Sequence, residues 1–326
     1  MQIKSLLCSS AFMMGLAIIV SLITNFTGVF PESLNADIRA DITIFCLAVM
    51  LTISFSRFPY KNLNPIEHSK SVLRSIILGL IVASIVPLAG YYLLSGTEWA
   101  SYAKGLVFIA ATPFAASVPP LSFILRGDME HALRSTIVVY ILALLWIPFI
   151  VWITLGKTVD MMTVVITVVE IIGIPLILSR LFTKVKIKKD TMAILLNCII
   201  FLLVWLSVSS ANFTSAGTTI LIVFLIIAGL RTFFLGNVVE YTEKKMGIHW
   251  KQRVTDILMT SYKNKGIALA LCAATLGPEI PMAMVAIATS IIVDVCWVAF
   301  MDGVLFSKKR MIRELSAEGE DISDLI

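Results

Sequence analysis

Charged residues are scarce in this chain. Only 14% of its 326 residues are Asp, Glu, Lys or Arg, whereas a soluble domain carries about a quarter. Hydrophobic residues make up 58% of the chain, and the mean hydropathy is +0.94. This composition excludes an ordinary soluble domain and predicts an all-α membrane protein. The net charge of +5 is confined to certain loops, which indicates membrane topology and no nucleic-acid partner.

Motifs for metal binding and catalysis are missing from the sequence. The five cysteines are scattered through apolar stretches, with no CxxC and no Cys/His cluster, so we expect reduced packing residues and no metal or other cofactor. His68, His131 and His249 are assigned to loops, and we give them no role. HExxH and GxSxG do not occur, which argues against an enzyme. An intramembrane enzyme built on Glu170 and Asp294 is the alternative from another class.

Long apolar runs are abundant. Ten of them approach the roughly 20 residues that cross a bilayer core. They are Leu6–Phe26, Ile38–Phe55, Val72–Leu94, Tyr102–Leu125, Ala132–Leu155, Met161–Leu181, Met192–Ser210, Thr218–Leu235, Val254–Leu276 and Pro281–Phe306. We therefore predict ten transmembrane helices in two sets of five.

Basic residues gather in loops that fall on one side of these spans. They are Arg57, Lys61, Lys70 and Arg74, then Arg180, Lys184, Lys186, Lys188 and Lys189, then Lys244, Lys245, Lys251 and Arg253, and finally Lys308, Lys309, Arg310 and Arg313. Positive loops mark the cytoplasmic side. We therefore expect a multi-pass protein of the cell inner (plasma) membrane with both termini in the cytoplasm. The acidic tail, 309–326, is expected to be a mobile solvated end.

Two of the ten spans are interrupted. The fourth, YAKGLVFIAATPFAASVPPLSFIL, contains three prolines, which remove backbone donors and break a helix. The ninth, DILMTSYKNKGIALALCAATL, carries two lysines and a glycine near its middle, and such a block is tolerated where the backbone lines a cavity. Either break alone would suggest an ordinary kinked helix. Their matched positions indicate a transporter site and an inverted repeat, with one repeat at 1–155 and the other at 156–308.

Both interrupted spans resemble those of a known transporter family. FILRGDMEHAL, after the first break, and SYKNKGIALALCAATL, at the second, are similar to the broken helices of the bile acid:sodium symporter family. The likeness extends more weakly over all ten spans. It implies that family's fold: two inverted five-helix repeats, a panel of spans 1, 2, 6 and 7, a core of spans 3–5 and 8–10, and broken helices 4 and 9 that cross in the core.

Several sodium ligands implied by the resemblance are replaced in this chain. Matching on the Arg-Gly-Asp turn puts Val118 and Pro119 at the family's Ser-Asn pair, and of two hydroxyl ligands on the next span only Thr136 remains. The family's shared Glu corresponds to Met259, and its Gln to Lys263. Proton coupling, or exchange without a coupling ion, therefore fits the residues better than two sodium ions. A sodium-coupled symporter with a rearranged ion site is the alternative.

Three charged residues fall near the middle of their spans. With a rise of about 1.5 Å per residue, Lys263 and Asp294 lie at similar depth, where an unpaired charge costs several kcal/mol. We predict that Lys263 replaces the missing sodium as a built-in cation, with Asp294 within reach. A purely structural salt bridge and a free Lys263 that binds an anion are the other interpretations. Glu170 is, with Asp294, a candidate proton carrier, or a protonated structural residue. Arg231 and Asp256, nearer span ends, are expected at the interface.

Together these features predict a secondary active transporter that moves a small organic anion by alternating access. Half-helix N-termini at the breaks favour a carboxylate or similar anion. The expected partners are this solute and membrane lipids. Contacts to the solute or a coupling ion are expected from residues around the two breaks and on the spans beside them. These are Thr112, Ser117, Pro119, Ser122, Thr136, Thr260, Ser261, Tyr262, Lys263, Asn264 and Asp294.

Overall fold

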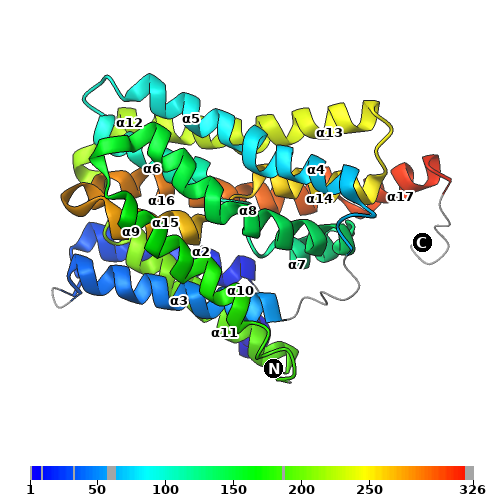
Figure 1. The fold of residues 1–326 in the computed structure, drawn as a ribbon, viewed down its shortest axis with the longest axis horizontal. Helices are drawn as coiled ribbons and strands as arrows, with labels where there is room; N and C mark the ends of the chain where they lie inside the picture. Colours follow the sequence, from blue (N-terminus) through cyan, green and yellow to red (C-terminus); the bar gives the residue numbers. More distant parts are fainter. Residues whose placement is uncertain (1, 9, 32–33, 57–63, 186–187, 320–326) are drawn as a thin grey trace.

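The computed structural model describes residues 2–8, 10–31, 34–56, 64–185 and 188–319. In these ranges the regular structure is helical, apart from one isolated antiparallel bridge between Phe114 and Lys263. Most helices run along the longest axis of the molecule (Figure 1). Arg57, Lys61 and Lys186, which we assigned to basic loops, lie outside the described residues.

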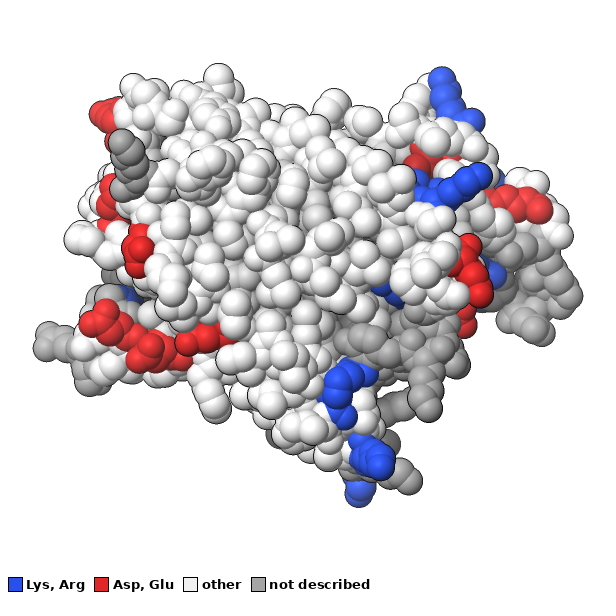
Figure 2. Space-filling view, in the orientation of Figure 1, with Lys and Arg blue, Asp and Glu red and all other residues white. Residues whose placement is uncertain are grey.

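Charged side chains are unevenly distributed over the surface. Figure 2 shows one face on which Asp, Glu, Lys and Arg gather toward the ends and leave the middle nearly free of charge. Large apolar side chains such as Phe45, Leu145 and Ile177 are exposed, as expected for surfaces that contact lipid. In the described part of the chain, seven helices are long and apolar enough to cross a membrane. The chain is therefore a multi-pass helical membrane protein.

The long helices follow the predicted segments closely. After α1 (Gln2–Cys8) and α2 (Ser10–Thr27) come α3 (Ala36–Ser56), the continuous α4–η2–α5 (Ser69–Ile76, Ile77–Val82, Ala83–Leu94), α8 (Met129–Leu155), α9–η4–α10 (Met161–Val168, Val169–Gly173, Ile174–Leu178), α11 (Lys189–Val208), α12–η5–α13 (Phe213–Gly229, Leu230–Phe234, Leu235–Lys245) and α16–η7 (Ile280–Phe300, Met301–Leu305). The largest departure is α13, which continues past the predicted end of its span at Leu235. The apolar run stops there, but no proline follows within α13, and Glu240, Glu243, Lys244 and Lys245 are good helix formers.

π-helical turns interrupt several of these spans. The segments η2, η4, η5 and η7 are of this kind. A π turn shifts the hydrogen-bond ladder and is frequent at functional sites. Gly79 lies in η2, Glu170 in η4 and Arg231 in η5.

The first interrupted span is broken as predicted. Helix α6 (Ala100–Ala111) ends at Thr112, whose backbone is extended, and α7 (Val118–Ile124) follows after a short irregular segment. Thr112 precedes Pro113, and a residue before proline is pushed out of the helical region. Proline at the start of α7 is tolerated because the first helical N–H groups have no partner within the helix.

The second interrupted span is also broken as predicted. Helix α14 (Trp250–Ser261) ends before Tyr262, and α15 (Lys265–Thr275) begins after three intervening residues. Asn264 forms the N-cap of α15, because its side-chain oxygen accepts the Ile267 N–H at 3.1 Å. The polar block that interrupts the apolar run thus supplies the cap for the second half-helix.

The helices form two groups. Helices α2, α3, α10 and α11 lie together along one side of the molecule, at the bottom of Figure 1, and pack against one another. Helices α5, α6, α8, α12 and α16 form the other group. The remaining halves of the two broken spans, α7, α14 and α15, pack with this group. Half-helix α15 packs against α3 and α9 as well as α6 and α16. The second break therefore lies where the two groups meet.

Three polar residues lie deeper than we predicted. Arg231 and Asp256, expected at the interface, are 1% and 0% exposed. His131, expected in a loop, lies in the first turn of α8 and is also buried. These predictions were wrong for one reason. The helices extend beyond the apolar runs, so polar residues at the ends of the runs lie inside the bundle, where ion pairs compensate their burial.

The described part of the C-terminal tail forms a helix in place of the expected mobile end. Helix α17 (Lys308–Ala317) packs near α14. Buried Arg253 contacts Glu314 at 3.0 Å and Glu318 at 3.2 Å. The Glu318 carboxylate also accepts the Trp250 N–H at 2.9 Å. These ion pairs and hydrogen bonds fasten the tail as far as Gly319.

Candidate functional site

The two breaks cross and hydrogen-bond to each other. The Ala115 N–H donates to the Tyr262 carbonyl, and the Asn264 N–H donates to the Pro113 carbonyl, both at 2.8 Å. Backbone groups freed by a broken helix must find partners inside a membrane protein. Each break therefore satisfies the other, and the pair forms one structural unit.

Lys263 occupies a cage of oxygen atoms at this crossing. Its side chain is almost completely buried. The Nζ atom lies 2.7 Å from the Thr112 carbonyl, 3.1 Å from the Gly79 and Ala110 carbonyls, and 3.2 Å from Ser84 Oγ. The ammonium group thus meets the free carbonyls at the C-terminal end of α6, which is the negative end of the helix dipole. Backbone and hydroxyl oxygens of this kind are also the ligands that a hard cation prefers.

Arg231 hydrogen-bonds to the C-terminal end of α14, which is the first half of the second broken span. It is 1% exposed, and its Nη1 donates to the Ser261 carbonyl at the end of α14, at 2.5 Å. Its Nη2 donates to Ser290 Oγ at 3.3 Å and to a carboxylate oxygen of Asp294. The first half of each broken span therefore ends on a buried basic side chain supplied by the protein.

Asp294 pairs with two cations, and Lys263 is not one of them. Lys265 Nζ lies 2.8 Å from Asp294 Oδ2, and Arg231 contacts Oδ1. The predicted Lys263–Asp294 pair was therefore wrong. The two lysines lie two residues apart across the break, and the turn between them sends Lys263 toward α6 and Lys265 toward α16. The group of Lys265, Arg231 and Asp294 has one positive charge in excess.

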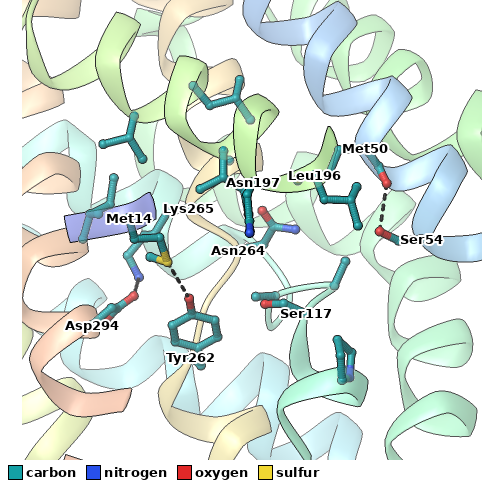
Figure 3. A pocket seen from close by; sticks show the side chains of 18 of the residues that line it. Met14, Met50, Ser54, Ser117, Leu196, Asn197, Tyr262, Asn264, Lys265 and Asp294 are labelled. Atoms are coloured by element: carbon teal, nitrogen blue, oxygen red, sulfur yellow. Dashed lines mark hydrogen bonds and ion pairs between the residues drawn. The ribbon is translucent and has the colours of Figure 1, made fainter. Parts of the chain in front are cut away.

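A cavity of about 450 Å³ adjoins the crossing. Figure 3 shows Lys265 paired with Asp294 on one wall, and Tyr262 near Met14, whose sulfur lies 4.0 Å from the tyrosine oxygen. The opposite wall comes from α2, α3 and α11. The lining is mostly apolar, with a few polar groups near the crossing. It comprises Met14, Met50, Ser54, Ala115, Ala116, Ser117, Pro120, Met192, Ala193, Leu196, Asn197, Ile200, Leu203, Val204, Tyr262, Lys263, Asn264, Lys265, Gly266, Leu269, Ile291 and Asp294.

Five of the predicted site residues line this cavity. They are Ser117, Tyr262, Lys263, Asn264 and Asp294. Asn264 is held in place by Tyr140, whose hydroxyl accepts its side-chain N–H at 2.7 Å.

The other predicted residues lie in the protein interior behind the cavity wall. Thr136, Thr260 and Ser261 donate their hydroxyl hydrogens to backbone carbonyls one turn earlier, and Ser122 bonds to Thr255. Thr112 contributes its carbonyl to the Lys263 cage, and Pro119 is buried in α7. Glu170 is only partly buried in η4 and is not part of the cavity lining.

Several site residues were missed by the sequence reasoning. Lys265 is the most important, because its ammonium group pairs with Asp294 at the cavity wall, and its place beside Lys263 in KNKG was a visible signal. Arg231 was missed because it lies near the end of an apolar run. Asn197, within the seventh predicted span, was an unusual polar residue in an apolar helix. The apolar wall residues carry no sequence signal that distinguishes them from packing residues.

Comparison with known families defines the class of this protein. The model of the sodium bile acid symporter family matches residues 42–231. The match covers more than half of the chain and includes the first break. The molecule is thus a membrane transporter by class. It belongs to the sodium bile acid symporter family. No curated protein matches the chain.

Proposed function

We propose that this protein is a secondary active carrier that moves a small organic anion by alternating access. In this proposal the chain has ten spans in two inverted repeats. Helices α2, α3, α9–α10 and α11 form a panel, and the remaining spans form a core that moves against it. The observation that carries the proposal is the crossing of two broken helices beside a cavity between the two helix groups. Broken helices that meet in the membrane are typical of transporter binding sites.

The present conformation fits a state that faces the basic loops. The cavity lining includes Ser54 and Met192, which lie close to the basic ends of α3 and α11. At the other end α15 packs tightly on α3, since a Cβ atom on Gly266 would lie 2.8 Å from Leu47 Cδ1. The positive loops mark this as the cytoplasmic side, so the structure fits an inward-facing carrier.

The anionic solute is supported by charge at the cavity wall. Lys265 opens α15, where the helix dipole adds partial positive charge, and it shares Asp294 with Arg231. A carboxylate on the solute would balance the excess positive charge of this group. The apolar wall would then cover the rest of the solute.

Sodium coupling is disfavoured by Lys263. Its ammonium group fills the carbonyl cage that a metal ion would otherwise need, and it repels a cation. Proton coupling is proposed in its place. Protonation of Asp294 would release Lys265 for the solute, while Arg231 would remain hydrogen-bonded to Ser261 and Ser290. Glu170 is the second candidate proton carrier.

A sodium-coupled symporter is the second candidate function, and the family match is the observation that favours it. Neither the crossing of the broken helices nor the family match supports an intramembrane enzyme, because members of this family transport their substrates. The two transport candidates differ in the gradient that drives uptake.

Uptake into proteoliposomes tests the proposal. Labelled bile acids and smaller monocarboxylates would be presented with an inward sodium gradient, an inward proton gradient or neither. We expect accumulation of at least one anion under the proton gradient, and loss of that uptake in Lys265→Gln. Uptake that requires sodium and ignores the proton gradient would support the second candidate. No uptake of any anion, with chemical conversion of one, would contradict a carrier.

A further inference from the structure

A second group of buried charges lies away from the cavity, near the basic ends of four helices. It contains Arg74 of α4, His131 of α8, Glu243 of α13 and Asp256 of α14. His131 and Asp256 are buried, and Glu243 is 4% exposed. None of these residues lines the cavity. The cluster is therefore independent of the proposed solute site.

Asp256 is the centre of the cluster and is fully satisfied. Arg74 Nε lies 2.7 Å from its Oδ2, and His131 Nε2 lies 2.9 Å from its Oδ1. Ser75 Oγ lies 3.2 Å from the same Nε2, and Ser135 Oγ, which donates its hydrogen to Ser75 Oγ at 3.0 Å, lies 3.4 Å from Nδ1. Arg74 and Asp256 thus form an ion pair.

Glu243 is the member without a donor. As a carboxylate, neither of its oxygens accepts a hydrogen bond from the described residues. Arg74 Nε is 3.5 Å from Glu243 Oε1, but it is closer to Asp256. A buried carboxylate without donors is costly. The carboxyl groups of Glu243 and Asp256, however, share Arg74 Nε and are hydrogen-bonding neighbours. One proton on Glu243 would turn this contact between two acceptors into a hydrogen bond.

The surrounding charges do not supply the missing donor. Arg253 of α14 is the other cation near Glu243, and it contacts Glu240 of α13 and Glu314 and Glu318 of α17. Lys244, next to Glu243, pairs with Glu314 at 2.6 Å. On α4 and α8 the facing titratable groups are Arg74 and His131. Arg74 is shared between the carboxylates of Asp256 and Glu243, whose oxygens lie 2.7 and 3.5 Å from its Nε.

We propose that Glu243 and Asp256 form a proton-binding site in which Glu243 takes the proton and donates it to Asp256. The site joins α13 to α14, and through Arg74 and His131 also to α4 and α8. Arg74 is partly exposed, which gives the site a route to solvent on the side of the basic loops. Since α14 leads directly into the second break, the proton holds the segment that carries Lys263 in place. Two neighbouring carboxyl groups that share one proton titrate as a unit.

The pH dependence of stability tests this site without any knowledge of the solute. A proton held more tightly by the folded protein stabilises it at low pH, and this stability is lost as pH rises. The unfolding constant of the wild type should then rise about tenfold per pH unit over part of the range from pH 5 to 9. Thermal melting in detergent would measure it. Glu243→Gln supplies an amide N–H to Asp256 permanently, so its melting temperature should lose this dependence.

Two controls identify the residue that titrates. His131→Gln should keep the pH dependence of the wild type, because Glu243 remains. Glu240→Gln, on the same helix, should also keep it. The proposal is overturned if Glu243→Gln retains the full pH dependence, or if His131→Gln abolishes it. Failure of Glu243→Gln to fold at low pH would also count against it, since the amide reproduces the proposed hydrogen bond. These results do not depend on whether the protein carries an anion.

Discussion

At the scale of single residues, the buried basic side chains at the crossing have different kinds of oxygen partner. Lys263 is surrounded by backbone carbonyls and a hydroxyl, without a carboxylate. Asp294 instead balances Lys265 and Arg231. In the proposed mechanism Lys263 is a structural cation in the crossing, and Lys265, paired with Asp294 at the cavity wall, is the cation that meets the solute.

Substitutions of Asp294 and Lys265 should differ greatly in cost. Asp294→Asn leaves Arg231 and Lys265 buried without a counter-charge, so we expect a loss of stability on the order of 3–5 kcal/mol. Lys265→Gln keeps the Arg231–Asp294 pair and removes the excess positive charge, so its cost should not exceed about 2 kcal/mol. Thermal or denaturant unfolding in detergent measures both. Equal losses in the two variants would contradict this view of the charges.

At the scale of elements, the breaks and their close packing position the site. Prolines end α6, and the Asn264 cap starts α15. Half-helix α15 approaches α3 where Gly266 has no side chain. In the proposed mechanism this contact closes the cavity on the side opposite the basic loops.

A side chain at Gly266 should separate α15 from α3. The Cβ of Gly266→Val would lie 2.8 Å from Leu47 Cδ1, and such overpacking costs about 1–3 kcal/mol. The double variant Gly266→Val, Leu47→Ala should recover part of this loss, because it removes the clashing group. Gly229→Val is the matched control, since a Cβ there meets nothing within 4 Å. The melting temperature should fall most in Gly266→Val, less in the double variant and least in Gly229→Val. Equal falls at the two glycines would refute the close contact.

Sequence reasoning predicted the elements better than the contacts. Apolar runs and helix breakers act locally, so the long helices and both breaks could be read from the sequence. The partners of Lys263 could not, because they depend on how η2 and α6 pack around the second break. Arg231 was misplaced for a related reason: a charge near the end of an apolar run can face either the interface or the bundle interior. Packing alone decides between them.

At the scale of the whole molecule, two groups of helices meet at a cavity, and the protein's own cations occupy the ends of both broken helices. Family membership establishes a transporter. We infer that this transporter needs no metal ion to assemble its crossing, because Lys263 and Arg231 already satisfy the carbonyls there. Relatives that hold an ion at such positions would be stabilised by that ion, since any ligand that binds the folded state adds to its stability.

The response of thermal stability to sodium, in the wild type and in two Lys263 variants, tests this claim most directly. Melting would be followed in NaCl and in choline chloride at equal ionic strength. Wild type should melt at the same temperature in both salts. Lys263→Ala empties the oxygen cage and should be stabilised by sodium, by about 2.7 kcal/mol when sodium is a hundredfold above its Kd. Lys263→Met fills the same space with an apolar chain and should show no response. Stabilisation of the wild type by sodium, equal to that of Lys263→Ala, would contradict the account.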